Sequence, residues 1–173
     1  MAKKSVFCIV RSEPQAAAIV ADLRTAGFSS NDVSVLFPDT TGTRDLAHEG
    51  ASKAPEGATV GGGTGGVVGG ALGWLAGIGV LAIPGLGPFI AAGPIMAALS
   101  GAAVGAAVGG LGGALVGAGI PEYEAKRYEG KVTAGGVLLA VHTEDGKERS
   151  RVKEIFERHH AEDIGTSGEA RAA

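Results

Sequence analysis

The centre of this chain carries no charge and repeats glycine at every fourth position. No Asp, Glu, Lys, Arg or His occurs between Glu56 and Glu122. An interior glycine destabilises a helix in water by roughly 1 kcal/mol relative to alanine. Helices this rich in glycine therefore need a partner helix, and glycines spaced by four form a ridge where two backbones can touch. The predicted packing and oligomerisation residues are Gly61, Gly65, Gly69, Gly73, Gly77, Gly101, Gly105, Gly109, Gly113 and Gly117.

Two segments of this stretch are long enough to cross a membrane as helices. Residues 60–83 and 95–120 would each span roughly 36–39 Å, which exceeds a hydrocarbon core of about 30 Å. Pro84, Pro88 and Pro94 separate them, so the sequence predicts a glycine-zipper helical hairpin over 59–120. Bulky residues off the glycine ridge are expected to face lipid or other subunits, and they include Leu72, Trp74, Leu75, Leu111 and Leu115.

Both ends of the chain have the pattern of a β-α-β unit. Residues 5–10 are apolar, Ser12 is a candidate N-cap for a helix that ends near Gly27, and residues 33–37 follow as a strand. Residues 136–141, a helix with Val152, Ile155 and Phe156 on one face, and residues 164–167 repeat that order. The predicted fold class is therefore α+β, a ferredoxin-like split β-α-β domain that the hairpin interrupts. The predicted divisions are 1–38 and 121–168 for that domain, 39–58 for a flexible linker, 59–120 for the hairpin and 169–173 for a tail.

Several stretches also resemble a known family. They are 5–10 (SVFCIV), 26–28 (AGF), 32–36 (DVSVL) and above all 119–130 (GIPEYEAKRYEG) followed by 135–141 (GGVLLAV). Together they make the chain similar to the bacterial heat-induced or general-stress-protein family, and in particular to members with a glycine-zipper insertion. The resemblance implies a stress-associated bacterial protein and brings no catalytic residues with it.

The sequence offers no strong signal for catalysis, for a cofactor or for a metal. Gly61, Gly63 and Gly66 match a dinucleotide fingerprint formally, but no strand precedes them and Leu81 stands where an acid is needed. Adjacent His159 and His160 would point about 100° apart on a helix, which disfavours chelation. We expect no catalytic, cofactor-binding or metal site, with Cys8 as a small core residue. A net charge of −3 also argues against nucleic acid as a partner.

A short charged and aromatic segment follows the second glycine tract. Tyr123, Lys126, Arg127 and Tyr128 fit an interfacial anchor at the level of lipid headgroups. They fit equally an ordinary connecting helix held by pairs such as Glu124 with Arg127.

These observations favour a non-enzymatic protein that self-assembles through the hairpin. We expect homo-oligomers at or in the cytoplasmic membrane, with membrane lipid as a partner and the α+β domain in the cytosol. A soluble cytoplasmic shell or filament, an oligomeric pore and a small-ligand sensor remain as alternatives. Gly and Ala are only mildly apolar, which keeps the soluble assembly open.

Overall fold

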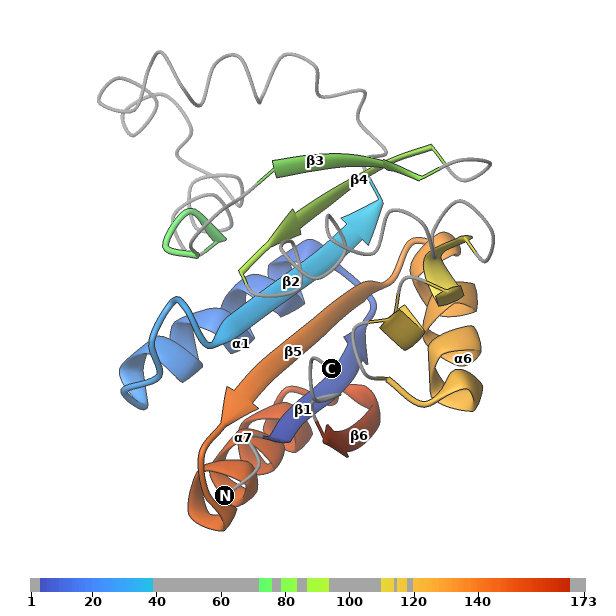
Figure 1. The fold of residues 1–173 in the computed structure, drawn as a ribbon. Helices are drawn as coiled ribbons and strands as arrows, with labels where there is room; N and C mark the ends of the chain where they lie inside the picture. The colour runs from blue at the N-terminus through green and yellow to red at the C-terminus, as the bar shows by residue number, and fades with distance from the viewer. Residues whose placement is uncertain are drawn as a thin grey trace, which may run out of the picture.

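The computed structural model describes residues 4–38, 72–75, 79–83, 87–93, 110–113, 115–117 and 120–168. They form an α+β fold around one six-stranded sheet (Figure 1), which confirms the predicted class. The strands are β1 (Lys4–Val10), β2 (Val33–Pro38), β3 (Gly79–Ile83), β4 (Gly87–Ala92), β5 (Val137–Thr143) and β6 (Glu162–Gly168). The helices used below are α1 (Glu13–Thr25), α6 (Glu122–Thr133) and α7 (Gly146–Arg158).

The two ends of the chain interleave within this sheet. The strand order is β3-β4-β2-β5-β1-β6, and all neighbouring strands run antiparallel. β5 therefore lies between β1 and β2, and β1 lies between β5 and β6. Each β-α-β unit supplies the strand that fills the gap in the other, so neither half makes this sheet without the other.

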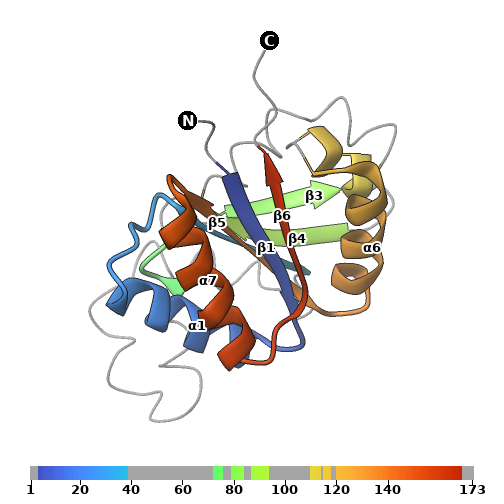
Figure 2. The same cartoon turned by 90° about the horizontal axis from the view of Figure 1, so that it is seen from below.

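Local sequence signals set the ends of the two crossover helices. Ser12 Oγ accepts a hydrogen bond from Gln15 N at the start of α1, and Gly27 adopts a φ of +92° just after its end. At the start of α7, Asp145 Oδ1 accepts from Glu148 N, and Glu148 Oε2 accepts from Glu144 N. The predicted cap at Ser12, the predicted glycine after α1 and the strand-helix-strand order are thus confirmed, and both helices lie on one face of the sheet (Figure 2).

The sheet is covered on both faces. Alternate residues of β1 divide between two cores, because successive side chains of a strand point to opposite faces. Val6, Cys8 and Val10 join the core under α1 and α7, whereas Phe7 and Ile9 join the core under α6. Cys8 is fully buried, which confirms its predicted place in the core.

The glycine-rich region contains strands where helix and turn were predicted. Residues 79–83 were predicted to end the first long helix, but they form β3, so the helix prediction is wrong there. Residues 87–92 form β4, which pairs with β2 and with β3. Val80 and Ile83 favour extended backbone, Gly79 and Pro84 disfavour helix, and β2 offers an edge to pair with. Residues 110–113 and 115–117 are helical, as predicted. The rest of the predicted hairpin lies outside the described residues.

Five bulky side chains of this region that the structure describes pack on the sheet. Leu75 belongs to the core under α1 and α7, with Leu72 and Trp74 packed against it, and Leu111 and Leu115 belong to the core under α6. The prediction that these five residues face lipid or other subunits is therefore wrong in this fold. None of the helices formed by the described residues is both long enough and apolar enough to span a bilayer.

Docking of β4 on β2 can be tested at Gly93. This residue has a φ of +79°, and a Cβ there would overlap the carbonyl oxygen of Val33. We expect Gly93→Ala to lower the free energy of unfolding by about 3 kcal/mol, from left-handed strain and overlap together. Gly27→Ala is the matched control, because Gly27 has a φ of +92° with no atom within 4 Å, and it should lose only about 1 kcal/mol. Equal losses in urea denaturation would contradict the docking.

Candidate functional site

Three of the ten predicted packing glycines lie within the described residues. Gly73 is exposed in a turn, Gly113 is half-buried in a helical turn, and Gly117 is exposed at the end of the next helical turn. The other seven lie outside the described residues, and their role in helix packing stays a prediction.

A glycine outside the predicted series makes a close contact. Gly112 packs so tightly on α6 that a Cβ there would lie 2.6 Å from Glu129 Oε2. Its neighbours Leu111 and Leu115 are fully buried beside Tyr128 and Val132 in the same core. Gly112 thus lies against the Glu129 carboxylate, the end of a flexible side chain on α6. The spacing of four did not single out this position.

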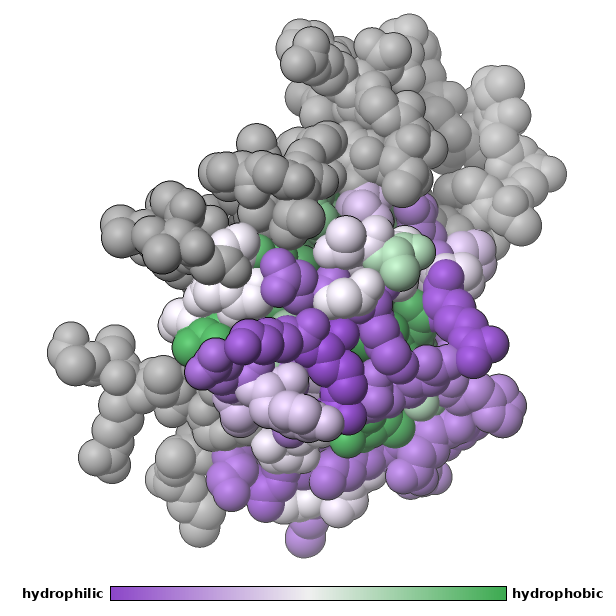
Figure 3. Space-filling view, turned by 90° about the vertical axis from the view of Figure 1, so that its right-hand side faces the viewer, coloured by the Kyte–Doolittle hydropathy of each residue, from purple (hydrophilic) through white to green (hydrophobic). Residues whose placement is uncertain are grey.

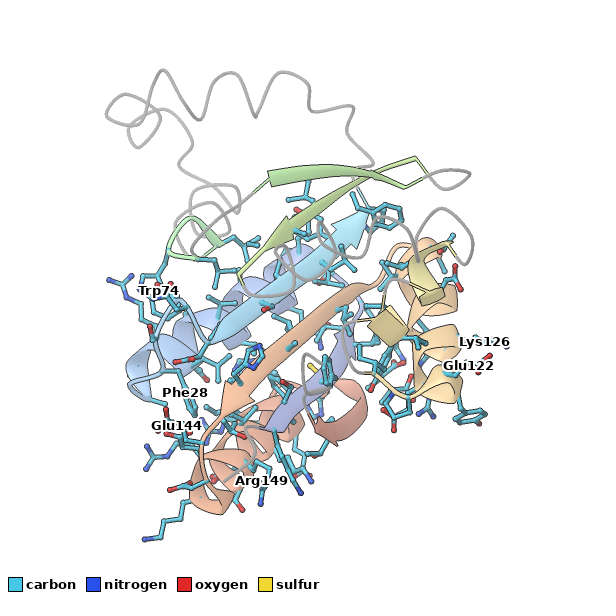
Figure 4. The ribbon with its side chains drawn as sticks, viewed as in Figure 1. Phe28, Trp74, Glu122, Lys126, Glu144 and Arg149 are labelled. Atoms are coloured by element: carbon cyan, nitrogen blue, oxygen red, sulfur yellow. The ribbon has the colours of Figure 1, made fainter. Side chains whose placement is uncertain are left out.

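Trp74 attaches a second part of the insertion to the domain. The Arg24 guanidinium lies over the Trp74 ring at 5.7 Å from its centroid, within the range of a cation–π interaction. Figure 4 places Trp74 beside α1, and Leu75 next to it is 4% exposed. Residues 72–75 and 110–117 therefore attach the insertion to opposite faces of the sheet.

The predicted interface residues of α6 divide between surface and core. Tyr123 is 78% exposed, and Lys126 pairs with Glu122 on the outer side of the helix (Figure 4). Arg127 lies over the Tyr123 ring at 5.5 Å. The surface on this side of the molecule is largely hydrophilic (Figure 3). The anchoring role of Tyr123, Lys126 and Arg127 stays a prediction.

Tyr128 does not belong to that surface. It is fully buried, with its ring 6.2 Å from the ring of Phe7, and its hydroxyl donates a hydrogen bond to the Asp163 carbonyl oxygen. Burial raises the pKa of Tyr128, and the nearby charge of Glu124 raises it further. The prediction of Tyr128 at a membrane interface is thus wrong in this fold, because the residue joins α6 to β6.

A cluster of charges joins α6, β6 and the end of β1, and we call Arg11, Arg127, Lys131, Glu162 and Asp163 the α6–β6 cluster. Lys131 Nζ lies 2.8 Å from Glu162 Oε2 and 2.6 Å from Asp163 Oδ2. Arg11 also pairs with Glu162, and Arg127 pairs with Asp163 at 3.5 Å. The Asp163 and Glu162 carboxylates raise the pKa of Lys131, whereas Lys131 and Arg11 lower the pKa of Glu162. Sequence reasoning missed this cluster, because its members come from distant segments.

Two hollows lie on the surface of the domain. One, of about 400 Å³, lies between α1 and α7 and is lined by Asp22, Arg151 and Arg158 among others. Beside this hollow, His159 Nε2 lies 2.8 Å from Asp22 Oδ2, so His159 is paired with a carboxylate. The second, of about 250 Å³, has Phe28, His142 and Glu144 in its lining, with Phe28 and Glu144 close together in Figure 4. Both mix acidic groups with other polar or apolar groups, so neither selects one ligand class.

The described residues bring together no metal-ligand cluster, and their one cysteine is buried. Within them no three His, Cys, Asp or Glu side chains lie close enough together to hold a metal ion. Burial raises the pKa of the Cys8 thiol, so the reactive thiolate form is disfavoured.

The α6–β6 cluster predicts a pH-dependent stability. The lowered pKa of Glu162 gives stability that is present above its ordinary value of 4.5 and lost as the pH falls through the lowered value. The raised pKa of Lys131 gives stability that is present below 10.5 and lost as the pH rises through the raised value. We expect Lys131→Met to lower the melting temperature at pH 7 and to lose this effect in acid. The loss should be about 1 kcal/mol or less, because Lys131 is 37% exposed.

Lys126→Met is the matched control for this measurement. The side chains of Lys126 and Glu122 are 72% and 73% exposed, so breaking their pair should leave the melting temperature nearly unchanged at every pH. An equal response of both variants in thermal denaturation from pH 3 to pH 8 would contradict the assignment.

Comparisons with protein-family models, with curated proteins and with solved structures found no match to this chain. The resemblance to general-stress proteins therefore stays a prediction from the residues quoted above.

Proposed function

We propose that this chain is a non-enzymatic, self-assembling protein in which an α+β domain presents glycine-rich segments for contact between copies. The observation that carries this proposal is the attachment of the charge-free insertion at three places. Residues 72–75 pack under α1 and α7, β3 and β4 extend the sheet, and residues 110–117 pack under α6. The glycine tracts that contain Gly65 and Gly105 are therefore connected at both ends to segments of the folded domain.

The attachment limits the length of chain that is free to form long helices. Of the two predicted spans, residues 60–71 and 95–109 lie outside the attached segments. As helices they would reach roughly 18 Å and 22 Å, less than the ~30 Å of a hydrocarbon core. This limit supports assembly by backbone contact between glycine ridges, as in the soluble shell or filament, while the domain keeps this fold.

A second candidate is assembly at the cytoplasmic membrane. It is favoured by the absence of any charged residue from 57 to 121 and by the exposed Tyr123 and Lys126 beside that stretch. Crossing the bilayer would require Trp74, Leu111 and Leu115 to leave the sheet. That release would lose the free energy of their apolar burial, about 1.5–3 kcal/mol for each fully buried leucine.

We further infer that strands β2, β5, β1 and β6 with helices α1 and α7 form a ferredoxin-like domain. The support is their interleaved antiparallel order and the placement of both helices on one face. A role in bacterial stress rests on the sequence resemblance alone, and it gives the assembly a biological setting.

Self-assembly is tested by changing one glycine of the predicted ridge. We expect the wild-type protein to form multi-subunit particles without detergent, and Gly105→Leu to reduce their mass because the new side chain separates the backbones. Ala103→Leu is the control, since residue 103 would lie on the opposite side of a helix from Gly105. Light scattering after gel filtration measures the mass. A monomeric wild-type protein, or equal masses for both variants, would contradict the proposal.

Membrane association is tested with the single tryptophan, Trp74. If the insertion enters lipid, the protein should float with anionic vesicles, and brominated acyl chains should quench Trp74 emission. Arg24→Gln should strengthen the quenching, because it removes the cation–π contact that holds Trp74 on α1. Recovery of all protein in the soluble fraction, with unchanged emission, would exclude this second candidate.

A further inference from the structure

The two edges of the sheet are protected very differently. β6, at one edge, carries Glu162 and Asp163, and its pairing with β1 shifts register between Phe7 and Ile9. Asp163 also has a φ of +49°, which bends the strand away from regular extended backbone. Charges and irregular backbone are the devices by which proteins keep an edge strand from pairing with another chain.

β3, at the other edge, has none of these devices. Its sequence, GVLAI over Gly79–Ile83, contains no charge and no proline, and its five residues pair with β4 in an unbroken register. Among the described residues, no strand pairs with its outer side. A regular, uncharged edge strand of this kind readily accepts another strand.

The register identifies which backbone groups point outward. Ala82 lies opposite Pro88, and proline has no N–H, so this must be a non-hydrogen-bonded pair of the antiparallel ladder. The alternate residues Gly79, Leu81 and Ile83 therefore direct their N–H and C=O groups to β4. Val80 and Ala82 direct theirs to the outer edge of the described sheet.

We propose that the outer edge of β3 pairs with β3 of a second copy, antiparallel and about a two-fold axis at Leu81. In this register Val80 of each copy faces Ala82 of the other, so every outward N–H and C=O group of the strand finds a partner. The flanking chain carries no charge from 57 to 121, so no like charges meet across the axis. This inference rests on the proposed self-assembly and names its first contact, which joins two sheets into one.

Disulfide trapping tests the pairing at its axis. The two Leu81 residues would form a non-hydrogen-bonded pair with Cα atoms about 4.5 Å apart, which suits a disulfide. We expect Leu81→Cys to give a covalent dimer within minutes of mild oxidation in the full-length protein. Cys8 is fully buried, so the wild-type chain should stay monomeric on a non-reducing gel.

Val80→Cys is the matched control. In the proposed register Val80 faces Ala82 of the other copy. The two Val80 residues are therefore offset by about 7 Å along the strand, which is too far for a disulfide. Cross-linking of Leu81→Cys with little from Val80→Cys supports the pairing. Two results would overturn the pairing. One is the absence of the Leu81→Cys dimer, which is expected if another segment of the same chain or a foreign peptide covers β3. The other is equal cross-linking of both variants.

A proline at Ala82 provides an independent test. Ala82→Pro removes an outward N–H and leaves the bonds to β4 in place, so the two-fold contact should be lost while the fold remains. Ala82→Ser keeps that N–H and should preserve the contact. We expect Ala82→Pro to halve the particle mass at unchanged circular dichroism, and an unchanged mass would overturn the pairing.

The glycine variant separates this inference from the proposed function. Edge pairing predicts that Leu81→Cys still cross-links when Gly105→Leu is added, because β3 does not use the glycine ridge. If particles depend on Gly105 but Leu81→Cys fails to cross-link, self-assembly stands and the β3 contact is wrong. If the wild-type chain is monomeric and Leu81→Cys fails as well, both are wrong.

Discussion

The pairing of β1 with β5 is the interaction on which the rest of the molecule depends. It aligns Lys4 with Thr143 and Val10 with Val137, and so joins the two ends of a chain that a long uncharged region separates. Both strands supply side chains to both cores, and β1 carries β6 on its other side while β5 carries β2. Because these contacts are distant in sequence, the sheet closes only when β5 and β6 have been brought back to β1.

That closure gives the insertion a second role besides linking two halves. β4 continues the sheet beyond β2, Trp74 lies against Arg24 on α1, and Leu111 and Leu115 fill the core under α6. α6 connects the insertion to β5, and Lys131 of the α6–β6 cluster and the buried Tyr128 attach it to β6. The glycines then differ in function, since Gly93 and Gly112 admit backbone and carboxylate of the same domain, whereas the predicted ridge around Gly105 would admit another copy.

The sequence predicted the two halves of the domain well because their signals are local. Ser12, Gly27 and Asp145 set helix ends through their own backbone neighbours, and the buried faces of α1 and α7 follow helical spacing. It failed at residues 79–83, predicted as the end of a helix, and at residues 87–92, predicted as part of a turn, because the edge of β2 selected strands there. It also missed Tyr128 as a core residue and Lys131 as the centre of a charge cluster, because both depend on β6, a partner that spacing does not reveal.

Parts of the uncharged insertion belong to the folded domain, with β3 and β4 in the sheet and with Leu111 and Leu115 in the core under α6. Hydrogen exchange followed by mass spectrometry, on the intact protein without detergent, tests this claim most directly. Peptides from β4 (87–92) and those containing the buried Leu111 and Leu115 should exchange slowly, on the timescale of peptides from β2 and β5, since β4 is paired on both sides and the two leucines lie in the core under α6. Free exchange in those two regions, beside a protected β1 and β5, would contradict it.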